Sequence, residues 1–299
     1  MPWLSLLVGL ACGLLTWMML DPVLNQRLEK IFHNDLNQRL ELSSTETRQR
    51  FEGFLKEWGM VGHGLAHHWR LVDYLNTPAW LETLEVQRRY TVWHTPEWLE
   101  SNNPRLSSVE PAQIALLDSD GGAREVFEVN PIAFELRQLT RFFDERETVQ
   151  ITTVQQKPYL VVFSQIRRPE GYDPAYLMLA IEIDEHFLAE SQKTIPSADT
   201  VIALLDTDTQ LLLVSSDPAA IFPATPLNHW SQRYLVTSQA LAEFQATDQN
   251  LLFSTLVSRR SAQETLQNII GLAQQDRLIA TLVYICLLYT SPSPRDRYI

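Results

Sequence analysis

The sequence predicts an α+β protein: a long N-terminal helix, two small antiparallel β-sheets and a helix that leaves the second sheet. Two observations support this fold class. Residues 114–120 (IALLDSD) recur almost unchanged as residues 202–208 (IALLDTD). Residues 23–77 contain no proline and place apolar side chains at three- and four-residue steps, as an amphipathic helix does.

Each copy of the repeat has the pattern of a β-hairpin. An apolar run ends in Asp-x-Asp at Asp118 and at Asp206, and a second β-prone run follows. Asp and Gly accept the backbone geometry of tight turns, and short apolar runs between turn signals are typical of buried strands. The repeat favours a duplicated module, and two unrelated hairpins with similar strand sequences remain the alternative.

Further strands follow each hairpin. The first module has strand-like runs at residues 149–155, 159–167 and 176–183, and the second has them at 234–237 and 251–258. Turns, rather than regular crossover helices, separate most of these runs. This arrangement favours antiparallel sheets.

The N-terminus predicts a membrane anchor. Residues 2–20 carry no charged side chain, and Trp3 and Trp17 lie near the two ends of this stretch. Such a run is long enough to cross a bilayer as a helix. A cleavable signal peptide is the competing interpretation, but no basic segment precedes the run and no small-x-small site precedes Asp21. We expect the chain beyond Asp21 to be exported.

The C-terminal end predicts the start of a second membrane helix, because residues 278–285 are again apolar. Residues 286–299 (CLLYTSPSPRDRYI) resemble the translation of a sequencing adapter. On this interpretation the natural sequence is interrupted inside the second membrane helix. A genuine Ser-Pro tail is the alternative.

Composition excludes some functions. The formal net charge is −12, whereas a nucleic-acid partner requires a basic face, so no nucleic-acid binding is expected. The two cysteines, Cys12 and Cys286, lie in the first predicted membrane helix and in the adapter-like tail. The exported part therefore has no disulfide and no cysteine metal site.

Glycines and histidines gather near the end of the long helix. Gly59, Gly62 and Gly64 predict a kink or a break there, because glycine weakens helices. His63 and His67 are four residues apart and share a helix face, which is a possible metal or haem arrangement. No Glu completes a zinc-hydrolase motif, so we interpret these histidines and His68 as structural or solvated and predict no metal site and no cofactor.

A candidate ligand site lies in the proline-broken segment 77–111. Arg89, Tyr90, Trp93 and His94 combine cationic and aromatic side chains. Such side chains bind small anionic or amphipathic ligands by stacking and bidentate pairing. Packing of a loop-rich layer is the alternative role of these residues.

Catalysis is not expected in this chain. Asp118 with Asp120, and Asp206 with Asp208, could pair as acids or hold a cation. They lie at hairpin turns, however, where Asp is favoured for local hydrogen bonding, and no calcium-loop glycine or distal Glu accompanies them. Motifs of serine hydrolases, zinc hydrolases and phosphate-binding loops are absent from the sequence.

The organisation of residues 23–285, together with the two Leu-Leu-Asp-x-Asp hairpins, resembles the extracytoplasmic sensor regions of bacterial transmembrane receptors of the Cache/CHASE type. The resemblance implies two PAS-like modules on a long helix, a small-molecule or periplasmic ligand, and a homodimer formed through the stalk helix. It also implies a downstream histidine kinase of a two-component system, or a diguanylate cyclase. The amine-binding pattern of this family, Arg-x-Trp-Tyr, is only approximated by residues 89–93 (RYTVW).

The resemblance places the protein in the inner membrane, with residues 22–277 periplasmic or extracellular. A membrane-anchored envelope protein with a binding or structural role is the alternative function. The expected divisions of the chain are a signal anchor (1–21), a helical stalk (22–76), a membrane-distal module (77–193), a smaller membrane-proximal module (194–260), an exit helix (261–277), the start of a second membrane helix (278–285) and the adapter-like tail (286–299).

Overall fold

The computed structural model describes the backbone of residues 2–77, 90–91, 97–100, 104–128, 140, 143, 147–168, 170, 172–192, 200–209, 211–218, 226, 230–244 and 250–290. The chain divides into two compact units. One consists of residues 42–257, and the other combines residues 1–41 with residues 258–299.

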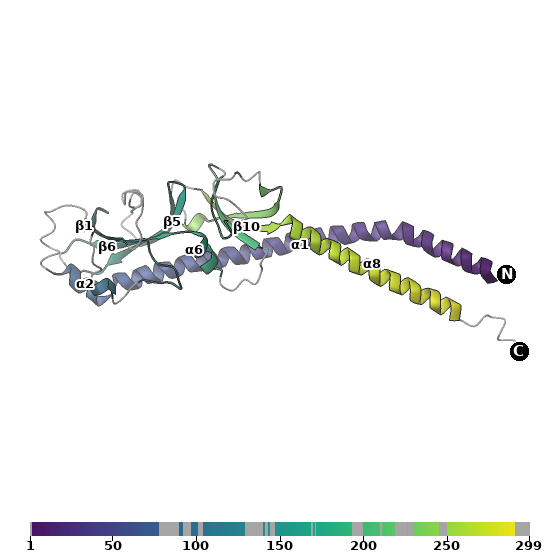
Figure 1. Ribbon diagram of the computed structural model, residues 1–299. Helices are drawn as coiled ribbons and strands as arrows, with labels where there is room; N and C mark the ends of the chain where they lie inside the picture. Colours follow the sequence, from purple (N-terminus) through teal and green to yellow (C-terminus); the bar gives the residue numbers. More distant parts are fainter. Residues whose placement is uncertain are drawn as a thin grey trace. The chain divides into compact units, whose positions relative to one another are not determined.

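The larger unit contains two sheets (Figure 1). The first has the strand order β1-β3-β2-β6-β5-β4 and is antiparallel apart from the β1–β3 pair. Its strands are β1 (Tyr90–Thr91), β2 (Gln113–Leu117), β3 (Ala123–Glu128), β4 (Thr148–Val154), β5 (Lys157–Ile166) and β6 (Ala175–Glu182). The three predicted strands after the first hairpin match β4, β5 and β6 to within two residues at each end. The two-residue β1 was not predicted.

The second sheet has the order β8-β7-β10-β9. Its strands are β7 (Thr200–Asp206), β8 (Leu211–Ser215), β9 (Tyr234–Ala240) and β10 (Leu251–Ser258). In each sheet the first strand of the hairpin also pairs, antiparallel, with the last strand of its module: β2 with β6, and β7 with β10. The predicted α+β class with two antiparallel sheets is confirmed.

The two repeated hairpins share their turn chemistry. The Asp118 Oδ1 atom accepts hydrogen bonds from the backbone N–H groups of Asp120 at 3.2 Å and Gly122 at 2.7 Å. In the second hairpin Asp206 Oδ1 accepts from the N–H of Asp208 at 2.9 Å. Carboxylates bonded to the backbone two residues on are turn formers. The aspartates therefore have the local role that was predicted for them.

A shared irregularity supports the duplication. The pairing register shifts between Leu116 and Leu117 in the first hairpin, and between Leu204 and Leu205 in the second. These two steps occupy the same place in the repeated sequence. The two hairpins therefore share an irregularity of strand pairing at the same step, in addition to the similar sequences of their first strands.

The helices are α1 (Pro2–Ala66), α2 (Trp69–Leu75), α4 (Glu97–Glu100), α6 (Glu185–Glu190), the 3₁₀-helix η1 (Ala242–Phe244) and α8 (Arg259–Thr290). A kink or a break was predicted near Gly59, Gly62 and Gly64, and the break is wrong, because α1 continues through these glycines to Ala66. A Cβ atom on Gly59 would lie 2.7 Å from Val149 Cγ2, and one on Gly62 would lie 2.7 Å from Val162 Cγ1. These two glycines allow the helix backbone to approach β4 and β5 closely.

In the larger unit α1 packs against both sheets. Nearer its C-terminal end the buried Trp58 belongs to the core cluster that includes residues of the first sheet. Closer to the N-terminus of α1, the Phe51 ring lies 5.1 Å from the ring of Phe253 on β10, and Thr47 Oγ1 lies 3.1 Å from Thr255 Oγ1. One helix thus contributes to the hydrophobic core under two sheets.

The smaller unit contains the first part of α1 and the whole helical course of α8. Arg277 Nη1 donates to Asp21 Oδ1 at 2.6 Å and to Asn25 Oδ1 at 3.3 Å. The side chains of Asp21 and Arg277 are only 17% and 22% exposed. This partly buried ion pair joins the two helices.

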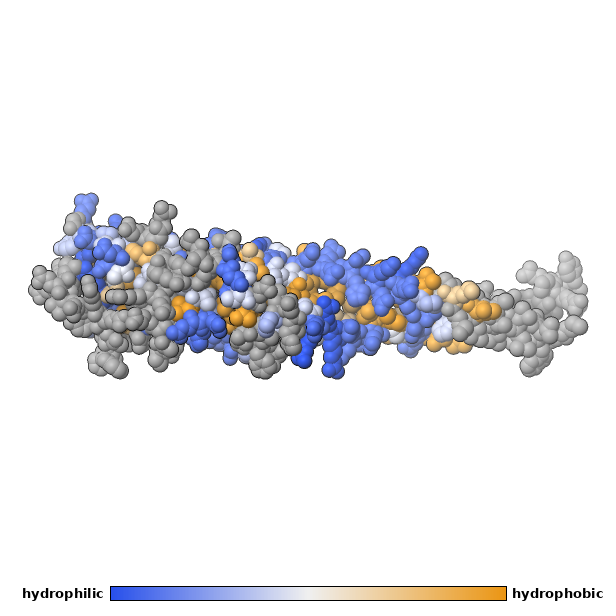
Figure 2. All heavy atoms as spheres, turned by 90° about the horizontal axis from the view of Figure 1, so that it is seen from above, coloured by the Kyte–Doolittle hydropathy of each residue, from blue (hydrophilic) through white to orange (hydrophobic). Residues whose placement is uncertain are grey.

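Apolar side chains are exposed on α1 and α8. In Figure 2, orange atoms lie next to the grey atoms at the right-hand end of the molecule. The exposed apolar side chains include Leu15, Met19, Ile31, Leu278, Ile279, Leu282 and Val283. Among the residues whose side chains are described, no helix is both long and apolar enough to cross a membrane. The side chains of residues 1–14 and 284–290, which belong to the two predicted spans and the adapter-like tail, lie outside that description.

The close approach of α1 to the first sheet leads to a stability prediction. The substitution Gly62→Ala places a methyl group against Val162, which is buried, and should destabilise the protein by about 1–3 kcal/mol through overpacking. Gly53→Ala is the matched control, because nothing lies within 4 Å of its Cβ position. Alanine there should stabilise the helix by up to about 1 kcal/mol. Denaturant unfolding followed by tryptophan fluorescence measures both changes, and equal stability of the two variants would contradict the close contact.

Candidate functional site

The predicted ligand residues are only partly placed by the structure. Arg89, Trp93 and His94 lie outside the described residues. Tyr90 begins β1 and is the register partner of Glu125 on β3. The ligand site at these four residues therefore stays a prediction.

A half-buried polar pair joins α2 to β3, the strand beside Tyr90. The Tyr74 hydroxyl, on α2, lies 2.8 Å and 2.9 Å from the two carboxylate oxygens of Glu125 and donates to this carboxylate. Burial raises the pKa of Glu125 above its ordinary value, and the hydrogen bond from Tyr74 opposes that shift. Burial, followed by the contact with Glu125, raises the pKa of Tyr74, so the phenol stays protonated.

The raised pKa of Glu125 predicts a pH dependence. Because the folded state binds this proton more tightly than the unfolded chain does, the stabilisation is fully present below the ordinary glutamate pKa. It is lost as pH rises through the folded-state pKa. Glu125→Gln keeps an acceptor for Tyr74 but removes the titration. Melting temperatures measured between about pH 4 and pH 7 should show wild type losing stability relative to this variant as pH rises, and parallel curves would contradict the prediction.

The described part of the chain also has a surface pocket, with a volume of about 420 Å³. It lies where β5 ends and the chain turns towards β6, close to the end of α1. Its volume is in the range of small-molecule sites. The lining residues are His67, Glu147, Gln165, Ile166, Arg167, Arg168, Tyr172 and Pro174.

Arg168 gives this pocket a cationic wall. Its Nη1 atom donates to the carbonyl oxygen of Asp173 at 2.7 Å, and its guanidinium lies 4.9 Å from the centre of the Tyr172 ring. Burial, and then the nearby Arg124, lowers the pKa of Arg168, but a guanidinium remains charged at neutral pH. Together with Arg167 it suits a carboxylate or phosphate group. The sequence analysis did not select this arginine pair, because it lies in a turn without a recognisable motif.

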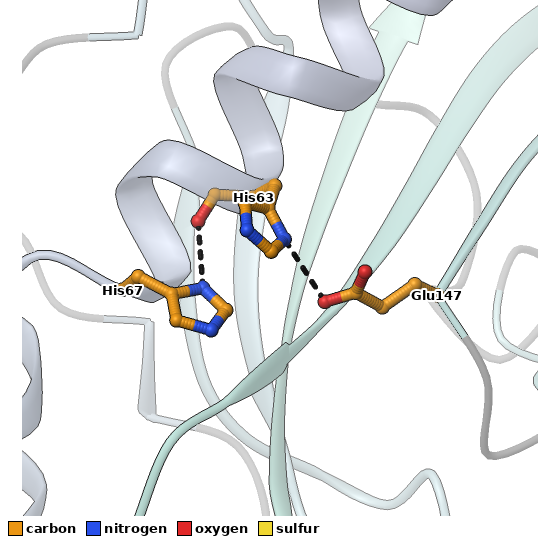
Figure 3. A group of neighbouring side chains, drawn as sticks. All are labelled: His63, His67 and Glu147. Atoms are coloured by element: carbon orange, nitrogen blue, oxygen red, sulfur yellow. Dashed lines mark hydrogen bonds and ion pairs between the residues drawn. The ribbon is translucent and has the colours of Figure 1, made fainter.

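Three side chains of types that can bind a metal lie close together (Figure 3), and two of them, His67 and Glu147, also line this pocket. His63 lies in the last turn of α1, His67 directly follows the end of that helix at Ala66, and Glu147 precedes β4. The two imidazole rings lie 4.1 Å apart, and His63 Nδ1 lies 3.1 Å from Glu147 Oε1. All three side chains are exposed, and their ligand atoms lie within 4.8 Å of one another.

The predicted shared face of His63 and His67 is confirmed, and Glu147 is the member that the sequence analysis missed. Glu147 is 84 residues from His63, and no local motif connects them. His68 does not belong to this group of three. It directly precedes α2, and its ring lies 6.0 Å from that of Trp69.

Ser108, His186 and Glu190 form a second polar group, and its hydrogen bonds do not activate the serine as a nucleophile. The Ser108 hydroxyl donates to Glu190 Oε1 at 2.7 Å and lies 2.8 Å from His186 Nε2. Because its only hydrogen is given to Glu190, the His186 nitrogen must donate to the serine oxygen. A catalytic histidine would instead accept the serine proton. This trio thus lacks the hydrogen bonding of a serine-hydrolase triad.

No protein family matches the chain, and no curated protein sequence matches it. Three solved structures illustrate what it is similar to. A domain assigned to a sensory box/GGDEF family protein of Vibrio parahaemolyticus is 14% identical, with a TM-score of 0.49, and the match covers 78% of this chain and 99% of that one. The periplasmic domain of Vibrio cholerae LuxQ is 14% identical, with a TM-score of 0.47, covering 73% and 100%.

The third is the ligand-binding domain of the Pseudomonas aeruginosa amino acid chemoreceptor PctB in complex with L-Arg. It is 13% identical, with a TM-score of 0.47, and the match covers 83% of this chain and 99% of that one. The TM-scores of these three structures are below 0.5, so the similarities identify neither a family nor a ligand for this chain.

Proposed function

We propose that this chain is the extracytoplasmic ligand-sensing part of a transmembrane signalling receptor of the inner membrane. One observation carries the proposal. The Asp21–Arg277 ion pair joins α1 and α8 at the position where both sequences become apolar, since residues 2–20 precede Asp21 and residues 278–285 follow Arg277. Two helices joined at this level would enter a bilayer together, and the part between them would remain on one side.

The connection between β10 and α8 supports a signalling role. β10 ends at Ser258 and α8 begins at Arg259, without an intervening loop. A ligand that binds one conformation of the sheets better than another shifts the equilibrium between them. Through this direct connection, a displacement of β10 would be passed to α8. The output domain proposed downstream of α8 is a histidine kinase or a diguanylate cyclase.

A homodimer through the stalk helix is part of the proposal. Val23 and Ile31 are 49% and 65% exposed on α1, although both are apolar. Apolar side chains on an exposed helix face are stabilised when a second helix covers them. A second copy of α1 would cover them in a symmetric receptor.

The proposed ligand is a small molecule bound by Arg89, Tyr90, Trp93 and His94. The half-buried Glu125, which is the register partner of Tyr90, adds a polar group to this part of the sheet. A set of side chains that includes a guanidinium, aromatic rings and a carboxylate suits a ligand that has both a charged and an apolar part. The cationic pocket at Arg167 and Arg168 is a second place where a small anion would fit.

The membrane topology can be tested by cysteine labelling in intact Gram-negative cells. With Cys286 replaced by alanine, Asn34→Cys and Gln263→Cys should react with a membrane-impermeant maleimide, because residues 22–277 are proposed to lie outside the cytoplasm. The native Cys12, inside the first proposed span, is the internal control and should stay unlabelled. Labelling of residues 34 and 263 only after lysis, or release of the chain by carbonate extraction, would overturn the proposed topology. Correct topology without an output domain in the genomic sequence beyond residue 285 would favour a membrane-anchored envelope protein.

The ligand site can be tested by thermal-shift screening of the full chain against amino acids, amines and small organic acids. A ligand should raise the melting temperature of wild type by several degrees, because ligands that bind only the folded state stabilise it. Arg89→Ala and Trp93→Ala should abolish the shift. Arg105→Ala, which removes a surface ion pair with Glu110, is the matched control and should keep it. Equal shifts in all variants, or no shift with any compound, would contradict this site.

A further inference from the structure

We propose that His63, His67 and Glu147 form a binding site for a divalent transition-metal ion of the zinc class. The inference does not depend on the sensory role. It rests on the type of the three side chains, their spacing, and the orientation of one imidazole.

The residue types fit zinc. Imidazole nitrogens and carboxylate oxygens are common ligands of Zn²⁺, whereas Mg²⁺ and Ca²⁺ prefer oxygen ligands alone. His67 directly follows α1, and its backbone N–H donates to the His63 carbonyl oxygen at 3.1 Å, which continues the helical hydrogen bonding. Residues four apart in such a turn lie on one face, and the two imidazole rings are 4.1 Å apart. Glu147 approaches that face from the start of the first sheet's edge strand, β4.

The orientation of His67 is already that of a metal ligand. Its Nδ1 atom lies 3.0 Å from the backbone carbonyl oxygen of His63. A carbonyl oxygen only accepts hydrogen bonds, so Nδ1 carries a hydrogen, and Nε2 is the ring nitrogen that is left to bind a metal. Metal-bound histidines typically have this arrangement, with the second ring nitrogen donating to a carbonyl or a carboxylate.

A zinc ion would require side-chain rotations that bring the ligand atoms closer together. With bonds of about 2.0–2.1 Å, the ligand atoms of a tetrahedral zinc ion lie about 3.3 Å apart. The ligand atoms of the three side chains already lie within 4.8 Å of one another. Since all three side chains are exposed, they can rotate without disturbing the core.

The bound ion would have a mechanical consequence. It would link the last turns of α1 to the start of β4, beside the place where Gly59 lets the helix approach Val149. Three protein ligands leave a fourth position for water or a small anion. His67 and Glu147 also line the pocket that contains Arg167 and Arg168, so an anion in this pocket could reach the ion.

The test uses the full chain, purified without a histidine tag and treated with a chelator. Titration with ZnCl₂ in a calorimeter should show one saturable site per chain, and the melting temperature should rise with zinc concentration. Co²⁺ should produce visible absorption bands that an excess of Zn²⁺ abolishes. MgCl₂ should produce neither heat nor a thermal shift at the same concentrations.

Variants locate the site. His67→Ala and Glu147→Gln should each weaken zinc binding by at least about tenfold, since even residues that only orient metal ligands contribute that much. His33→Ala, which removes an exposed histidine elsewhere on α1, is the matched control and should bind as wild type does. Absence of saturable binding up to about 1 mM zinc, or unchanged affinity in His67→Ala, would overturn the proposal.

Discussion

The close contact between α1 and the first sheet is the constraint on which the rest of the larger unit depends. Gly59 and Gly62 present no side chain towards β4 and β5, so Val149 and Val162 occupy the space that a Cβ atom would need. Protein cores are packed densely enough that a single methyl group matters at such a place. The glycines weaken the helix locally, but the burial that they permit outweighs this effect, and α1 continues to Ala66.

This contact also determines where the polar groups meet. Because the C-terminal end of α1 lies against the start of β4, His63 Nδ1 comes within 3.1 Å of Glu147 Oε1. The same packing places His67 and Glu147 on the wall of a pocket whose other wall carries Arg168. The candidate metal site and the cationic pocket are therefore consequences of one helix–sheet interface, and a change at Gly62 should affect both.

The same helix connects the two duplicated modules. Phe51 packs against Phe253 of the second sheet, while Trp58 belongs to the core cluster shared with the first sheet. A ligand that altered the first sheet would act on a helix whose core residues are shared with the second. From there, β10 continues into α8 without a loop. This sequence of contacts is the part of the structure on which the proposed signalling role rests.

The repeated hairpins, the strands other than β1 and the long helix could be predicted from the sequence, because turn chemistry and apolar periodicity are local properties. The Asp118 and Asp206 turns are examples, since each carboxylate bonds to backbone only two residues away. Only the tertiary structure decided the role of Gly62, which depends on a valine 100 positions further along the chain in another element. It also decided the partner of His63, because Glu147 is brought there by helix–sheet packing and not by any spacing that a sequence pattern records.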